Sequence, residues 1–235
     1  ELVPLLSFLF LRGRCRTCRQ KIGFQYPLVE LTSGLIFVLI PSYLYNLPAF
    51  KLTGFSSLNY TLVAIGYTLV FLTLLLITLI DFRLKLIPDE ANIFLVILGI
   101  AISILAIRDP AGNLHSFLGS YSILFGLSAS IWLNRLAAIL FGIIFYGLLI
   151  LITQGRGMGM GDLKLTAALG VIFGWPDVIL ITFLSFIVGS IFSLPGLLAR
   201  KKTLKSFLPF GPFIAAAPGI VFFYGENLMS MYFSL

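Results

Sequence analysis

Long uncharged apolar runs constrain the fold of this chain more than any other feature. One of them, Tyr60–Ile80, contains no charged side chain, and a helix that crosses a bilayer needs about 20 mostly apolar residues. Only 11% of the chain is charged and 59% is hydrophobic, whereas soluble domains carry about 25% charged residues. The runs lack the alternation of a membrane β-barrel strand. The sequence therefore predicts an all-α, polytopic transmembrane helical bundle in a lipid bilayer.

About seven spans, one of them short, are expected in this bundle. The segments cover residues 28–45, 60–80, 91–107, 136–153, 163–174, 178–198 and 212–232. The fifth segment would be roughly 18 Å long as a helix, against a hydrocarbon core of ~30 Å. We therefore expect it to cross a locally thinned membrane or to form a deep helix beside a water-filled cavity. Residues 117–133 are also apolar, but a crossing there would place the later basic loops on the opposite side of the membrane. We therefore predict that this segment is an interfacial or extracytoplasmic excursion.

The basic residues predict the orientation of the bundle, because cytoplasmic loops are enriched in lysine and arginine. With seven crossings and a cytoplasmic N-terminus, all 16 lysines and arginines except Lys51, Arg108 and Arg135 fall on the cytoplasmic side. The net charge of +7 therefore indicates membrane topology. It does not indicate a nucleic-acid partner, since the basic residues lie in short loops between spans.

A basic hairpin, residues 1–27, is expected to precede the transmembrane domain, residues 28–235. It contains Cys15 and Cys18, whose Cys-x-x-Cys spacing suits zinc, but a closed structural site needs four ligands. The chain has no other cysteine, and its single histidine, His115, is distant in sequence. A structural zinc therefore requires two further ligands from elsewhere; unligated thiols or a disulfide are the alternatives. Because the chain begins without an initiator methionine, we expect further residues upstream.

Two carboxylates are the candidate chemistry of the chain. Asp81 ends the uncharged run Tyr60–Ile80, and Asp162 follows alternating glycines at the start of the fifth segment. There Asp162 can cap free N–H groups, and the helix dipole favours its negative charge. An even number of predicted crossings separates the two aspartates, so both are expected at the cytoplasmic face.

Such a pair favours an aspartic dyad. Carboxylates a few ångströms apart share one proton, so that one acts as a general base on water while the other acts as an acid. A Ser-His-Asp triad is not available at this face, because His115 lies in a predicted extracytoplasmic loop. Two alternatives remain: a proton- or cation-coupled transporter that uses both aspartates as a relay, and an assembly component without chemistry, in which they are solvated span ends.

Five motifs, in this order, together resemble those of bacterial type IV prepilin peptidases: Leu11–Cys18, Tyr26–Leu31, Asp81–Asp89, Gly157–Lys164 and Pro209–Phe213. The resemblance covers nearly the whole chain, and the glycine-rich Asp motif is shared with presenilin-like intramembrane aspartic proteases. It implies that Asp81 and Asp162 are the catalytic pair of an aspartic endopeptidase in the bacterial inner membrane. The implied substrate is a prepilin or pseudopilin of a type IV pilus or type II secretion system, cut on the cytoplasmic side. Members often also methylate the new N-terminus with S-adenosylmethionine.

The resemblance also implies further site residues and shows departures from the family. Gly159, Gly161 and Lys164 are substrate-site candidates beside the dyad. Asp89 is another, although capping of the third span is its favoured interpretation, and Glu30 is a candidate for attracting a basic leader or for the first turn of its span. The pilin's apolar stem is expected in a gap beside the short fifth segment. Family members carry an upstream span and a first Cys-x-x-Cys pair that are not in these residues, and no glycine-rich nucleotide fingerprint marks a methyl-donor site.

Overall fold

The described part of the chain is helical. A computed structural model describes residues 4–47, 57–107, 116–119, 121–125, 130–155, 157–198 and 209–234. These residues form no β-sheet, and an isolated bridge joins Arg14 to Lys21 in the N-terminal hairpin. The helices are α1 (Pro4–Phe10), α2 (Gln25–Asn46), α4 (Ser57–Leu84), α5 (Asp89–Ala106), α6 (Tyr121–Phe125), α7 (Ile131–Thr153), α8 (Met160–Phe173), α9 (Asp177–Leu198) and α10 (Gly211–Phe233). The predicted all-α class is confirmed.

Each of the seven predicted segments forms one of the main helices. Every one of these helices begins and ends within five residues of its predicted segment. Within the described residues, five helical stretches are long and apolar enough to cross a bilayer: Gln25–Asn46, Leu58–Leu84, Asp89–Ala106, Ile131–Thr153 and Asp177–Leu194. The chain is therefore a multi-pass membrane protein. With 14 residues, α8 is too short to be one of the five, as its length in the sequence predicted.

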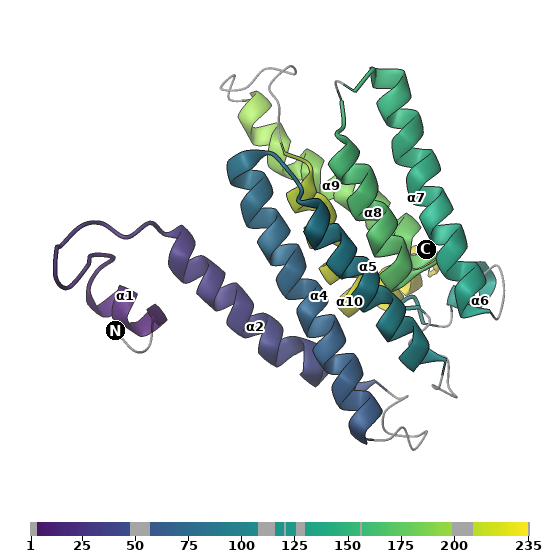
Figure 1. Cartoon of the computed structure of the whole chain (residues 1–235), viewed down its shortest axis with the longest axis horizontal. Helices are drawn as coiled ribbons and strands as arrows, with labels where there is room; N and C mark the ends of the chain where they lie inside the picture. Colours follow the sequence, from purple (N-terminus) through teal and green to yellow (C-terminus); the bar gives the residue numbers. More distant parts are fainter. Residues whose placement is uncertain are drawn as a thin grey trace.

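The short helix α8 lies inside the bundle, where it packs against α5, α7, α9 and α10. Most of its residues are buried. Gly170 brings it close to α7, since a Cβ there would lie 3.0 Å from the Ala138 carbonyl carbon. Figure 1 shows α8 enclosed between α5 and α7, with its N-terminus at the same end of the bundle as the C-terminus of α4. This packing explains how so short a helix is held in place.

An aromatic and polar core closes the other end of the bundle. Phe117 is buried against Phe222 with ring centroids 4.6 Å apart. The Asp177 carboxylate at the start of α9 accepts hydrogen bonds from the Phe117 N–H at 2.8 Å and from the Ser116 hydroxyl. In the described parts of segment 117–133, the short helix α6 is the only helix before α7. These parts therefore contain no membrane crossing, as the sequence predicted. The rest of this segment, together with His115, lies outside the described residues.

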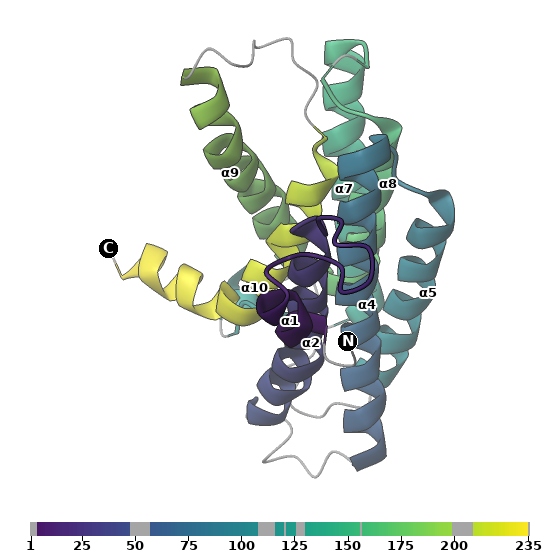
Figure 2. The same cartoon turned by 90° about the vertical axis from the view of Figure 1, so that its left-hand side faces the viewer.

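Two parts of the chain diverge from the bundle. The hairpin with α1 lies to one side, and α2 leads from it towards the start of α4 (Figure 1). The last helix, α10, changes direction, so that its C-terminal part runs away from the other helices (Figure 2). Pro218 lies inside α10, and a proline inside a helix is the usual cause of such a bend.

Candidate functional site

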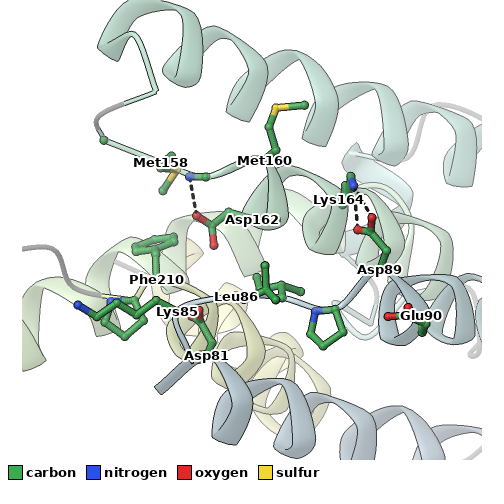
Figure 3. A pocket seen from close by; sticks show the side chains of 16 residues that line it. Asp81, Lys85, Leu86, Asp89, Glu90, Met158, Met160, Asp162, Lys164 and Phe210 are labelled. Carbon is green, nitrogen blue, oxygen red and sulfur yellow. Dashed lines mark hydrogen bonds and ion pairs between the residues drawn. The ribbon is translucent and has the colours of Figure 1, made fainter. Parts of the chain in front are cut away.

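Four chain segments meet in a pocket of about 540 Å³ at one end of the bundle. They are the last turn of α4, the turn into α5, the loop and first turns of α8, and the residues that begin α10 (Figure 3). The lining residues are Asp81, Lys85, Leu86, Ile87, Pro88, Asp89, Glu90, Gly157, Met158, Gly159, Met160, Gly161, Asp162, Lys164, Pro209 and Phe210. The structure thus brings together Asp81, Asp89, Gly159, Gly161, Asp162 and Lys164, all predicted site residues.

The end of α4 positions Asp81. The Lys85 N–H donates to the Asp81 carbonyl oxygen at 2.9 Å, and Lys85 then takes a left-handed conformation with φ 52°, which ends the helix. Asp81 is only 5% exposed. The Gly211 backbone N–H lies beside this carboxyl group, but within the described residues the Asp81 Oδ2 atom accepts no hydrogen bond of good geometry. Because a buried polar atom without a partner is costly, this oxygen is available to a water molecule or a ligand.

The first turn of α8 positions Asp162. The Asp162 Oδ2 atom accepts a hydrogen bond from the Gly159 N–H at 3.1 Å, which caps the helix as the sequence predicted. The residue is 8% exposed. Its other carboxylate oxygen points into the space between α8 and α4 (Figure 3). One oxygen of Asp162 therefore fixes the side chain, and the other faces the pocket.

The two aspartates are electrostatically coupled. Burial raises the pKa of Asp162 to about 6; the Gly159 hydrogen bond opposes this shift, and the Asp81 carboxyl raises the pKa further. This residue lies in the first turn of α8, outside the five candidate spans. Two interacting carboxyl groups titrate as a pair. A carboxyl group with this pKa gains and loses its proton much closer to neutral pH than an ordinary aspartate does, as acid–base chemistry with two carboxyl groups requires.

Tight backbone packing holds the pocket together. A Cβ at Gly161 would lie 3.1 Å from the Ile87 Cβ atom. A Cβ at Gly211 would lie 2.5 Å from Asp81 Oδ2 and 3.1 Å from the Ile87 Cδ1 atom. The buried Ile87 side chain therefore fills the space between the starts of α8 and α10, and Gly211 lets the backbone of α10 pack directly on Asp81. Sequence reasoning did not predict either role, although Ile87 and Gly211 both lie in motifs of the family resemblance, Asp81–Asp89 and Pro209–Phe213.

Charged groups surround the rim of the pocket. Lys164 of α8 forms an ion pair with Asp89 of α5 at 2.8 Å, and the two side chains are 46% and 62% exposed. Asp89 lies in the first turn of α5, where the capping interpretation had placed it, and Pro88 occupies the N-cap position. Glu30 lies on α2 and is not among the residues that line the pocket.

The cysteine pair lies in the hairpin before α2. Cys15 and Cys18 form no disulfide bond, and no group of three or more potential metal ligands occurs within the described residues. Two thiolates do not complete a structural zinc site, so the described residues do not by themselves fit that metal. Of the charges used to predict orientation, Lys51, Arg108, Arg156, Arg200, Lys201, Lys202 and Lys205 lie outside the described residues.

Comparison with known families decides among the hypotheses. Residues 1–44 match the bacterial peptidase A24 N-terminal domain, and residues 68–194, more than half of the chain, match the type IV leader peptidase family. The chain belongs to the type IV leader peptidase family. This assignment confirms the resemblance in the sequence motifs, and it favours the peptidase over the transporter hypothesis for the same two aspartates.

Curated relatives of this leader peptidase align along the whole chain. The prepilin leader peptidase/N-methyltransferase of Aeromonas salmonicida (strain A449) is 34% identical, over 100% of this chain and 70% of that protein. The proteins of the same name from Aeromonas hydrophila and Bacillus subtilis (strain 168) are 31% and 28% identical, over 99% and 100% of this chain and 69% and 80% of those proteins. No solved structure matches significantly.

Proposed function

We propose that this leader peptidase is an aspartic endopeptidase that removes the leader from type IV prepilins or pseudopilins, with Asp81 and Asp162 as its catalytic carboxyl groups. One observation carries the proposal. Two buried carboxyl groups from distant segments face one pocket, where Asp81 Oδ2 accepts no hydrogen bond of good geometry within the described residues and the Asp81 charge raises the pKa of Asp162. The relatives' names include both the leader peptidase activity and the prepilin substrate.

The proposed reaction uses one shared proton. The ionised Asp81 takes a proton from a water molecule, whose oxygen adds to the scissile carbonyl carbon. Protonated Asp162 donates a hydrogen bond to the carbonyl oxygen as negative charge develops there. The C–N bond of the tetrahedral intermediate then breaks, and a proton passes from the dyad to the leaving amine. The raised pKa of Asp162 supports its assignment as the acid.

The charges of the pocket support a basic substrate. Among the described residues, the carboxyl groups of Asp81, Asp89, Glu90 and Asp162 line it together with two amines, those of Lys85 and Lys164. Unlike charges attract more strongly at a partly buried site than in bulk water. We therefore propose that the basic leader of the precursor binds at this rim, near Gly159 and Gly161. Glu30, on α2, remains a proposed second anionic contact.

Our proposal for the arrangement in the membrane goes beyond the five candidate spans. We propose seven membrane segments, in which α8 is a deep, short helix and α10 completes the domain of residues 28–235, behind the hairpin of residues 1–27. The pocket end then faces the cytoplasm of a bacterial inner membrane. In support, Arg83, Lys85 and Lys164 all belong to segments at the pocket end, as the enrichment of basic residues on the cytoplasmic side requires.

A second activity follows from the names of the relatives. They are called N-methyltransferases as well as leader peptidases, which implies a methyl donor, and we propose S-adenosylmethionine for this chain. A structural zinc on Cys15 and Cys18 remains a proposal that requires two ligands from outside the described residues. Proteolysis by the two carboxyl groups requires neither S-adenosylmethionine nor zinc.

The proposal is tested by incubating purified protein with a prepilin in detergent and identifying the products by mass spectrometry. Asp81→Asn and Asp162→Asn are each expected to abolish cleavage, because an amide can neither accept nor release the shared proton. Glu226→Gln is the matched control, since it makes the same chemical change at an exposed residue of α10 outside the pocket lining. Cleavage retained by either aspartate variant would refute the dyad. An added CH₂ mass on the product would support methyl transfer.

A further inference from the structure

A second hollow, of about 360 Å³, lies between the apolar helices α2, α4 and α10. We call it the apolar groove. Its walls include Leu35 and Leu39 of α2, Phe71 and Leu74 of α4, and Ala216 of α10. From Pro212 to Phe223, the wall formed by α10 is roughly 16 Å long at the usual rise of a helix. The groove is thus about half as long as the hydrocarbon core is thick.

The two threonine hydroxyl groups in the groove donate their hydrogen bonds within their own helices. The Thr32 hydroxyl donates to the Leu28 carbonyl oxygen of its own helix at 2.9 Å, and the Thr78 hydroxyl donates to the Leu74 carbonyl oxygen at 2.8 Å. These side chains therefore present their methyl groups to the groove. A suitable occupant is apolar and needs no polar partner, as is true of a hydrocarbon chain or of a helix with apolar side chains.

The groove lies next to the catalytic pocket. Pro209 and Phe210 line the pocket, whereas Pro212, two residues later, lines the groove. On α4, Asp81 lines the pocket and Thr78, less than one helical turn before it, lines the groove. The two hollows therefore share the walls of α4 and α10 and lie on either side of the contact between Gly211 and Asp81. The groove therefore begins within about one helical turn of Asp81.

The shape of the groove suits one face of a helix. Ala215, Ala216 and Gly219 make the wall of α10 shallow, and small residues let a neighbouring helix approach closely in a membrane. At the far end, the Tyr43 ring packs on Phe222 and Phe223, with ring centroids 5.1 Å away in each case. From there α2 diverges from α4 towards the hairpin (Figure 1), so the groove opens towards the catalytic end.

We infer that the apolar groove holds the apolar helix of the membrane-anchored precursor next to its scissile bond. This inference rests on the proposed peptidase function. The position of the groove within one helical turn of the pocket, rather than apolar character alone, favours a polypeptide over a lipid chain. The site also differs from the gap expected beside the fifth segment, because α8 is packed against neighbouring helices on several sides and the groove lies between α2, α4 and α10.

A kinetic experiment with two substrates tests this inference. One substrate is a full-length prepilin, and the other is a short peptide that spans its cleavage site without the apolar segment. Ala216→Phe places a ring in the groove, and Ala101→Phe is the matched control at an exposed position of α5 outside it. Losing the burial of one apolar side chain weakens binding about tenfold to hundredfold. We expect this rise in the KM of Ala216→Phe for the prepilin, with peptide cleavage unchanged.

Crosslinking provides a measurement that does not depend on catalysis. A photoreactive benzoylphenylalanine replaces Leu39, in the groove, or Leu140, which is similarly exposed on α7, in an Asp162→Asn background reconstituted with prepilin. We expect a prepilin crosslink from position 39 and none from position 140. Crosslinks from position 39 to lipid only, or a normal prepilin KM in Ala216→Phe, would overturn the inference. A failure of the proposed dyad mechanism would be distinguished from these outcomes, because the Asp81→Asn variant would then still cleave prepilin.

Discussion

Gly211→Ala tests whether the backbone of α10 sets the position of the Asp81 carboxyl group, which we propose is catalytic. The added Cβ would lie 2.5 Å from Asp81 Oδ2 and 3.1 Å from Ile87 Cδ1. Both neighbours are buried, and Asp81 is less than one turn from the end of α4. The carboxylate therefore has to move by roughly 1 Å to restore an ordinary contact distance. A misplacement of this size in an active site costs on the order of 10²-fold in rate.

We therefore expect kcat/KM for prepilin cleavage to fall about 100-fold, equivalent to about 2.7 kcal/mol of transition-state stabilisation. The assay is cleavage of purified prepilin, resolved by gel, with unfolding in mixed micelles measured in parallel. Gly34→Ala is the matched control, because a Cβ at this position of α2 meets no atom within 4 Å. A Gly211→Ala enzyme that folds and cleaves at the wild-type rate would refute the reasoning.

Three further predictions concern the surrounding charges. Asp81→Asn is expected to lower the pKa of Asp162 from about 6, because it removes a charge that raises it; isotope-edited infrared titration measures this shift, and an unchanged titration would argue against coupling. Lys164→Met should change the free energy of unfolding by no more than about 1 kcal/mol, because its ion pair with Asp89 is exposed. It should also lower the KM for a basic leader at low salt, because the Asp89 carboxylate no longer pairs with a lysine. A higher KM would contradict a rim that attracts the leader. Asp177→Ala should destabilise the fold by about 3 kcal/mol, because two buried donors lose their shared acceptor, with peptide cleavage by the folded fraction unchanged. Loss of that cleavage would show that the two ends of the bundle are coupled.

The sequence by itself determined the positions of the helices and singled out the two aspartates as candidate site residues. A bilayer requires helical segments of about 20 apolar residues, so hydropathy alone located the main helices to within a few residues. The position of Asp162 after alternating glycines predicted its helix-capping hydrogen bond, because that role depends only on neighbours along the chain. The motif order also predicted the family.

Only the tertiary structure decided which residues surround the aspartates. Side chains that face lipid and side chains that face another helix are both apolar in a membrane protein, so hydropathy does not indicate which helices meet. The contact of Gly211 with Asp81 and the position of Ile87 between α8 and α10 therefore could not be read from the chain. The apolar groove arises for the same reason, since three helices far apart in sequence form its walls. Its existence depends on packing, and packing is a property of the folded bundle.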